Sequence, residues 1–337
     1  MSSHKTTLFE DKLIVVTGAA GFIGSGVVRH LNEMGYKNLV LVDDFKSTQK
    51  WKNLVGKDFF EMVSRYDLFD WLEGKERDIA AFIHLGACSD TVETDGDYFM
   101  ETNYRYSIEL AQYALANDHR FIYASSAATY GDGALGFVDD HDRLSTLKPL
   151  NMYGFSKHLF DLWAKNEGVL DQIVGLKYFN VFGPNETHKG RMASMVMHMK
   201  KAIDTEGVVK LFASNDPENY KDGEQVRDFI YVKDAVKVTC SFLVNDLAGI
   251  YNVGTSRPSS WNELATNVFE ALGQTPNIQY VPMPVDLSKQ YQNYTCADLS
   301  KFESNLQKSD LPKIQYHTLK AAVTDYIQNY LIDDNRW

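Results

Sequence analysis

The sequence is poor in cysteine and has no long apolar run. Three cysteines, Cys88, Cys240 and Cys296, are spread over 337 residues, which is too few and too scattered for a disulfide framework or a Cys-x-x-Cys metal site. No stretch approaches the ~20 apolar residues that cross a bilayer, and the N-terminus has no apolar signal region. We therefore expect a cytoplasmic protein with no metal site and no membrane partner.

Positive charge is also in short supply. The formal net charge is −11, with 34 Lys and Arg against 45 Asp and Glu. Proteins that bind nucleic acid need clustered cations to neutralise phosphates, so we expect no nucleic-acid partner. The hydrophobic content of 44% is enough for one large domain or two. We also expect a homo-oligomer, of a size that the sequence does not give.

A β-branched run near the N-terminus ends in closely spaced glycines. Residues 13–17 are apolar, the glycine-rich segment 18–24 follows, and apolar residues then recur at helical spacing. This order predicts a strand, a tight turn and a helix, whose N-terminus favours the negative charge of a pyrophosphate. A second apolar run, 39–42, ends at Asp43 and Asp44, where an acid that binds the adenosine ribose of a dinucleotide is expected.

Strands alternate with helical patterns over the first half of the chain. Apolar segments at 80–85, 121–124 and 173–176 are separated by amphipathic stretches such as 98–117. The alternation predicts an α/β fold with a Rossmann-type, doubly wound parallel sheet. We therefore assign residues 1–177 to a dinucleotide-binding domain.

The alternation weakens after residue 178. Proline and glycine gather there in loops, so we assign residues 178–337 mainly to a smaller C-terminal α/β substrate domain. Segments 227–232 and 249–254 have the composition of strands. We expect them to rejoin the first domain, in returns near 227–257.

Polar residues follow two of the predicted strands. Segment 86–89 and the serines of segment 125–126 come where strands end, and ligands of doubly wound sheets bind beyond the carboxyl ends of the strands. These residues therefore belong to the expected site, although a serine there is also a common helix or turn cap. Cys88 is expected to be a small buried residue beside the cofactor.

Tyr153 and Lys157 lie four residues apart, so on a helix they are neighbours on one face. Either this face is solvated or it carries chemistry. A tyrosine, with a reference pKa of ~10, ionises near neutral pH only beside positive charges, which Lys157 and an oxidised nicotinamide would supply. The apolar stripe of the same helix predicts that the pair faces away from the core; its residues are Phe155, Leu159, Leu162 and Trp163.

Together these residues resemble the extended short-chain dehydrogenase/reductase family of nucleotide-sugar enzymes. The resemblance runs from about residue 12 almost to the C-terminus. It includes segments 17–24 and 227–232, and its most specific parts are segments 86–89, 124–131, 178–181 and 188–194. Within the family, they are similar to enzymes that invert carbon 6 of ADP-D-glycero-D-manno-heptose to supply a lipopolysaccharide core precursor.

This resemblance implies an isomerase that keeps NADP bound and oxidises and re-reduces carbon 6 of an ADP-heptose. It implies that Tyr153 moves the hydroxyl proton, that Ser126 hydrogen-bonds the substrate oxygen and that Lys157 holds the nicotinamide ribose. It assigns Lys189 as the acid/base on the opposite face of carbon 6. The alternative role for Lys189 is to neutralise a phosphate of the ligand.

The resemblance also implies two wider sets of contacts. The expected cofactor site consists of Gly18, Gly21, Phe22, Ile23, Gly24, Asp43, Asp44, Lys50, Arg65, Leu85, Gly86, Ala87, Cys88, Ser89, Asn103, Lys157 and Val181. The expected substrate site consists of Ser126, Asn180, Lys189, Arg191, His198, Phe212, Arg227 and Tyr291.

The choice between NADP and NAD depends on charges near the ribose. Asp43 alone favours NAD, because an acid there repels a 2′-phosphate. Lys46, Lys50 and Lys52 follow closely, with Arg65 further on, and we expect these cations to outweigh the carboxylate and to select NADP.

Two other activities compete with this prediction. Dehydratases of the family carry an Asp-Glu pair after the catalytic serine, where this chain has Ala127 and Ala128. A nucleotide-sugar 4-epimerase and a non-enzymatic dinucleotide sensor stay open. The chain departs from the family pattern at Arg191, at Ala213 and in segment 216–225, so the resemblance predicts the hydride chemistry but not the details of nucleotide and sugar recognition.

Overall fold

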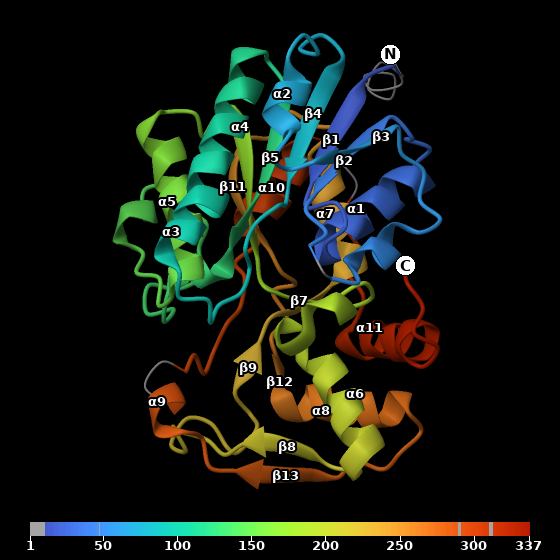
Figure 1. Ribbon diagram of the computed structural model, residues 1–337. Helices are drawn as coiled ribbons and strands as arrows, with labels where there is room; N and C mark the ends of the chain where they lie inside the picture. The colour runs from blue at the N-terminus through green and yellow to red at the C-terminus, as the bar shows by residue number, and fades with distance from the viewer. Residues whose placement is uncertain (1–10, 47, 289–290, 310–312) are drawn as a thin grey trace.

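One half of the molecule is built on a seven-stranded parallel sheet with the order β11-β6-β5-β4-β1-β2-β3 (Figure 1). The computed structural model describes residues 11–46, 48–288, 291–309 and 313–337; the polar start of the sequence, 1–10, lies outside the described residues. The strand order reverses between β1 and β4, as in a doubly wound sheet. The strands are β1 (Leu13–Thr17), β2 (Leu39–Asp43), β3 (Glu61–Ser64), β4 (Ile79–His84), β5 (Arg120–Ser126), β6 (Ile173–Tyr178) and β11 (Gly249–Val253).

Helices cover both faces of this sheet. Because side chains alternate along a strand, Ile14 and Val16 of β1 pack on one helical layer and Val15 packs on the other. The first layer consists of α1 (Phe22–Glu33), α7 (Val232–Ser241) and α10 (Ser300–Lys308). The second layer consists of α2 (Leu68–Leu72), α4 (Tyr106–Ala116) and α5 (Met152–Asn166). In the described residues, no helix is both long and apolar enough to span a membrane.

The second half of the molecule lies below the carboxyl ends of the sheet in Figure 1. Its helices are α6 (Met195–Glu206), α8 (Trp261–Ala271), α9 (Val285–Ser288) and α11 (Leu319–Tyr326), and α3 (Gly96–Phe99) lies with the first half. Its strands form three two-stranded sheets, which pair β7 (Asn180–Phe182) with β10 (Phe229–Tyr231), β9 (Val226–Arg227) with β12 (Ser259–Ser260), and β8 (Val209–Phe212) with β13 (Ile278–Val281).

Most of the predicted elements of the first half are confirmed. The five predicted strands are β1, β2, β4, β5 and β6, and segment 249–254 joins β6 in the large sheet as β11. Stretch 98–117 is helical, with one wider turn at Met100–Arg105 before α4. The edge strand β3 was not predicted, because its sequence, Glu-Met-Val-Ser, has few of the β-branched residues that mark a buried strand.

Segment 227–232, which we expected to return to the first domain as a strand, does not form one continuous strand. The segment breaks at Asp228 into β9 and β10, and both pair outside the large sheet. Asp228 is fully buried, and its carboxylate accepts hydrogen bonds from the backbone amides of Thr255, Ser256 and Ala297. Asp228 therefore connects the turn between β9 and β10 to the loop at residues 255–256 and to the segment at Ala297.

The predicted orientation of α5 is wrong. Phe155, from the apolar stripe, is 43% exposed, whereas Lys157 is 4% exposed. The buried side of α5 includes Lys157 and Asp161 together with Phe160. Counting apolar residues failed because these charged side chains are buried with polar partners inside the protein.

Candidate active site

A cavity of about 680 Å³ opens beyond the carboxyl ends of β1, β4, β5 and β6. It lies where the strand order reverses, which is where doubly wound sheets bind ligands. Most of the predicted site residues line it. They are Gly18, Gly21, Phe22, Ile23, Gly24, Asp43, Asp44, Lys50, Arg65, Leu85, Gly86, Ala87, Cys88, Ser89, Ser126, Tyr153, Lys157, Asn180, Val181 and Lys189.

The N-terminus of α1 forms one end of the cavity. Gly21 caps this helix without a side-chain hydrogen bond, and its first turn holds no acidic residue. Gly18 has φ +67°, and a Cβ there would lie 2.7 Å from the backbone nitrogen of Gly86. The loop therefore needs glycine at this position. The free amides and the helix dipole fit a dinucleotide pyrophosphate.

Charged side chains surround the end of β2. Asp43 accepts hydrogen bonds from the Ala20 amide at 2.7 Å and from Lys50 Nζ at 2.6 Å. Asp44 lies 4.0 Å from Arg65 Nε and 3.9 Å from Lys46 Nζ. The carboxylates predicted to bind the ribose are therefore paired with cations, so that this end of the cavity is not a purely acidic site.

Tyr153, Ser126 and Lys157 meet on one wall. Ser126 ends β5 and Tyr153 lies in the first turn of α5, where their side chains share a hydrogen bond. Burial raises the pKa of Tyr153, and the Ser126 hydrogen bond opposes that rise. Burial lowers the pKa of Lys157 to about 8, and Asp161 opposes the change. In the chain alone, Tyr153 therefore lacks the lowered pKa that we expected, and a positive ligand beside the phenol would have to supply it.

Lys189 lies on a separate segment of the cavity wall. Its ammonium nitrogen is 5.3 Å from the centre of the Phe22 ring, at the start of α1. Burial lowers the pKa of Lys189, and the nearby carboxylate of Glu186 opposes the change. A lysine with a lowered pKa can act as a base as well as a phosphate ligand.

Glu186 also lines the cavity and was missed by the sequence analysis. It is 1% exposed and accepts hydrogen bonds from the Ser194 amide at 2.6 Å and the Ser194 hydroxyl at 2.5 Å. Burial raises its pKa. A glutamate in a loop is usually exposed, so only its position three residues before Lys189 could have indicated it.

Six of the predicted site residues do not line this cavity. Asn103 is fully buried behind it, where its side chain bonds both backbone groups of Cys88. Arg191 is exposed and pairs with Asp90 at 2.8 Å. His198 Nε2 lies 3.3 Å from the Arg191 carbonyl oxygen. The remaining three, which belong to the second half of the molecule, are Phe212, Arg227 and Tyr291.

Arg227 and Tyr291 nevertheless lie together. The Arg227 guanidinium is 4.9 Å from the centre of the Tyr291 ring and 5.6 Å from that of the Trp261 ring. Trp261 lines the cavity and was missed by the sequence analysis. These contacts place Arg227, which is 8% exposed, next to the cavity rather than in its wall.

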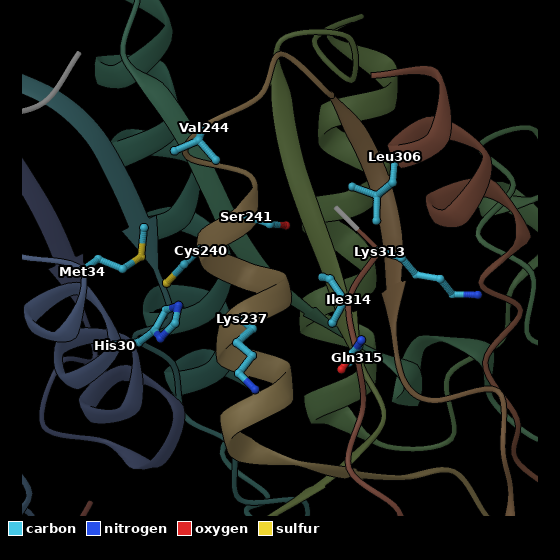
Figure 2. A pocket seen from close by; sticks show the side chains of 10 residues that line it. All are labelled: His30, Met34, Lys237, Cys240, Ser241, Val244, Leu306, Lys313, Ile314 and Gln315. Carbon is cyan, nitrogen blue, oxygen red and sulfur yellow. The ribbon is translucent and has the colours of Figure 1, made fainter. Parts of the chain in front are cut away.

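A second cavity, of about 420 Å³, lies on the outer side of the first helical layer. Figure 2 shows side chains from α1, from α7 and from the segment that holds Lys313 and Ile314 around it. Its walls are mainly apolar, and none of its lining residues was predicted to belong to a site. Of these two cavities, only the larger one is lined by the predicted catalytic residues Ser126, Tyr153, Lys157 and Lys189.

Similarities to known proteins extend over nearly the whole chain. Residues 14–254 match the NAD dependent epimerase/dehydratase family. The ADP-L-glycero-D-manno-heptose-6-epimerase of Nitratidesulfovibrio vulgaris is 48% identical over 95% of this chain and 98% of its own. That of Fusobacterium nucleatum is 43% identical over 96% and 100%. The crystal structure of the Helicobacter pylori ADP-L-glycero-D-manno-heptose-6-epimerase superposes with a TM-score of 0.79, at 30% identity over 96% of this chain and 97% of that one.

Proposed function

Because the chain belongs to the NAD dependent epimerase/dehydratase family, we propose that it inverts carbon 6 of ADP-D-glycero-D-manno-heptose to give ADP-L-glycero-D-manno-heptose. One observation carries the proposal: a single cavity contains the uncapped N-terminus of α1, the Ser126, Tyr153 and Lys157 wall, and Lys189. The relatives that match at 43% and 48% identity are heptose epimerases over nearly their full lengths. This favours a 6-epimerase over a 4-epimerase or a dinucleotide sensor.

The protein residues divide the work of inversion between two walls. A bound nicotinamide dinucleotide supplies the reversible oxidation of carbon 6. Tyr153 removes and returns the hydroxyl proton on one face, while Ser126 hydrogen-bonds the sugar oxygen. Lys157 holds the nicotinamide ribose and adds a positive charge near Tyr153. Lys189 acts as the acid/base on the opposite face of the sugar. Its lowered pKa increases the fraction of the neutral amine, which is the form that accepts a proton.

The cofactor within this proposal is NADP. Lys50 already neutralises Asp43 at 2.6 Å, which weakens the repulsion between that carboxylate and a 2′-phosphate. Lys46 and Arg65 line the same end of the cavity. These three cations, rather than Asp43, would therefore decide the preference between the two dinucleotides.

The proposal also assigns residues to the binding of the substrate, including its diphosphate. Arg227 has the planar fork of donors that suits a pyrophosphate, and Asn180 is an exposed residue of the cavity wall. We assign both to the substrate. A cytoplasmic location and homo-oligomeric assembly remain parts of the proposal.

Conversion of the purified nucleotide sugar tests the function. The protein should convert ADP-D-glycero-D-manno-heptose into its carbon 6 epimer, followed by proton NMR, and should leave UDP-glucose unchanged. Tyr153→Phe should lower turnover by roughly 100- to 10,000-fold while folding and cofactor content persist. Turnover of UDP-glucose without turnover of the heptose would replace this function with the 4-epimerase, and near-normal turnover of the variant would remove Tyr153 from the mechanism.

A further inference from the structure

The segment that carries Lys189 is anchored by one buried asparagine. Asn185 is 1% exposed and has φ +77°, in the left-handed region that asparagine tolerates better than most residues. Its side-chain nitrogen donates to Ser25 Oγ at 3.0 Å and to the Trp337 carbonyl at 3.1 Å, and its oxygen accepts from the Trp337 amide at 2.9 Å. Ser25 lies in the first turn of α1, so this amide links the segment directly to the helix that begins at the cavity.

A second buried side chain strengthens the same link. Asn53, also 1% exposed, donates to the Asn185 carbonyl and to the Ala20 carbonyl, both at 3.0 Å, and lies 3.3 Å from His188 Nδ1. Ala20 belongs to the glycine-rich turn before α1. Asn53 thus links two residues of the Lys189 segment, Asn185 and His188, to the turn at the cofactor end of the cavity.

The segment between Gly183 and Gly190 has two kinds of support. Glu186 bonds within it and to the nearby Ser194, which preserves its internal shape. Both flanking residues are glycines, with φ of +140° and +55°, and glycine restricts the backbone less than other residues do. Asn185 makes the contacts that fix this segment against α1, where Lys189 lies over Phe22.

We propose that Asn185 is a positioning residue for Lys189, which holds the lysine ammonium at the cofactor end of the cavity through the Ser25 and Trp337 contacts. The inference rests on the proposed function, because it gives Lys189 the second acid/base role. It assigns Asn185 no contact with the substrate. Displacing a catalytic group by about 1 Å can lower the rate roughly 100-fold. Loss of the Asn185 contacts should therefore lower the rate of the chemical step.

A double-mutant cycle tests the proposal. Asn185→Gly keeps the left-handed backbone and removes the amide, and it should lower kcat roughly 10- to 100-fold with little change in KM. In a Lys189→Met background the same change should alter kcat by less than about twofold, because residues that act through one group are not additive. Ser25→Ala, which removes one anchor of the amide, should give a smaller loss with the same dependence on Lys189.

A matched control separates positioning from folding. Asn245 is 8% exposed, and away from the cavity its side chain donates a hydrogen bond to the Ser241 carbonyl and accepts one from the Leu247 amide. Asn245→Gly should lower the thermal unfolding temperature as Asn185→Gly does and leave kcat unchanged.

Three results would overturn the proposal, and they can be told apart. Unchanged kcat in both Asn185→Gly and Ser25→Ala would make the amide purely structural while the proposed function stands. An equal loss from Asn185→Gly with and without Lys189 would show that Asn185 acts on another group. Normal turnover in Lys189→Met would remove the second acid/base itself, and Asn185 would then have no role in positioning it.

Discussion

Lys177 donates a hydrogen bond of 2.5 Å to Asp161, and neither side chain is exposed to solvent. Asp161 also accepts from the hydroxyls of Tyr123 at 2.9 Å and Ser125 at 2.8 Å, and Lys177 also donates to Thr129 at 2.6 Å. The pair thereby joins β5, which ends at Ser126, to β6 and to α5, which carries Tyr153 and Lys157. It connects the elements of one wall of the active site.

The first prediction concerns the stability that this pair provides. Lys177→Met leaves the Asp161 carboxylate buried without its cation, and it should lower the free energy of unfolding by about 3–5 kcal/mol. Asp161→Asn combined with Lys177→Met removes both charges and should recover most of that loss, because an uncharged amide costs less to bury than an unpaired carboxylate. Urea unfolding measures both effects.

An exposed ion pair provides the control. Lys210 and Glu206 lie 2.7 Å apart, and both side chains are about half exposed. Lys210→Met should cost no more than about 1 kcal/mol. If the buried and exposed lysine variants are equally stable, the Asp161–Lys177 pair does not stabilise the fold.

The sequence allowed a good prediction of the sheet and of the cofactor end of the cavity. Both depend on local patterns: runs of apolar residues for strands buried on two faces, and glycine spacing for the turn before α1. Ser126, Tyr153 and Lys157 could be placed together because strand ends and helix periodicity bring them to one edge.

Two other features of the site depend on distant contacts. The face on which α5 buries Lys157 follows from Asp161 and Lys177, partners 16 residues apart, which a count of apolar residues does not reveal. The positions of Arg227 and His198 depend on how the loops of the second half pack. Asp228 fixes part of that packing through its bonds to residues of other loops.

The second prediction is an alkaline limit of activity set by Lys157. Burial lowers its pKa to about 8, so the ammonium is present below that pH and is lost above it. The value of kcat/KM should therefore fall by about tenfold for each pH unit above the pKa. Lys157→Arg retains a cation, because guanidinium is not deprotonated in proteins, and its pH profile should lack this limb. A limb that persists in the arginine variant would belong to another group.

The third prediction concerns cofactor choice. Lys50→Ala leaves Asp43 without its cation, and it should weaken NADP binding by roughly 10- to 100-fold while NAD binding changes less. Lys52→Ala is the matched control, because Lys52 lies in the same short helical turn but is exposed and outside the cavity wall. Titration calorimetry on protein freed of cofactor measures both affinities. Unchanged NADP binding in Lys50→Ala, with NAD as the dinucleotide released from the purified protein, would contradict the choice of NADP.

The fourth prediction follows the hydrogen on carbon 6 of the sugar. The cavity combines the glycine-rich turn with Tyr153 and Lys189, and the chain has Ala127 and Ala128 after Ser126 instead of an acid pair. In this arrangement the protein residues move protons only to and from the oxygen on carbon 6. The hydrogen on that carbon should leave and return without exchange with water.

Epimerisation in deuterated water tests this prediction, because oxidation and reduction at carbon 6 brings no solvent deuterium into the sugar, whereas proton removal from carbon 5 does. Oxidation and reduction at carbon 6 should give product without deuterium on any sugar carbon, and substrate deuterated at carbon 6 should keep its label through the inversion. Removal of a proton from carbon 5, as in an enolisation or elimination, would instead bring solvent deuterium into the sugar. Mass spectrometry and deuterium NMR of the product separate these outcomes. Substantial solvent deuterium in the product would exclude direct oxidation and reduction at carbon 6, and with it the opposed roles of Tyr153 and Lys189.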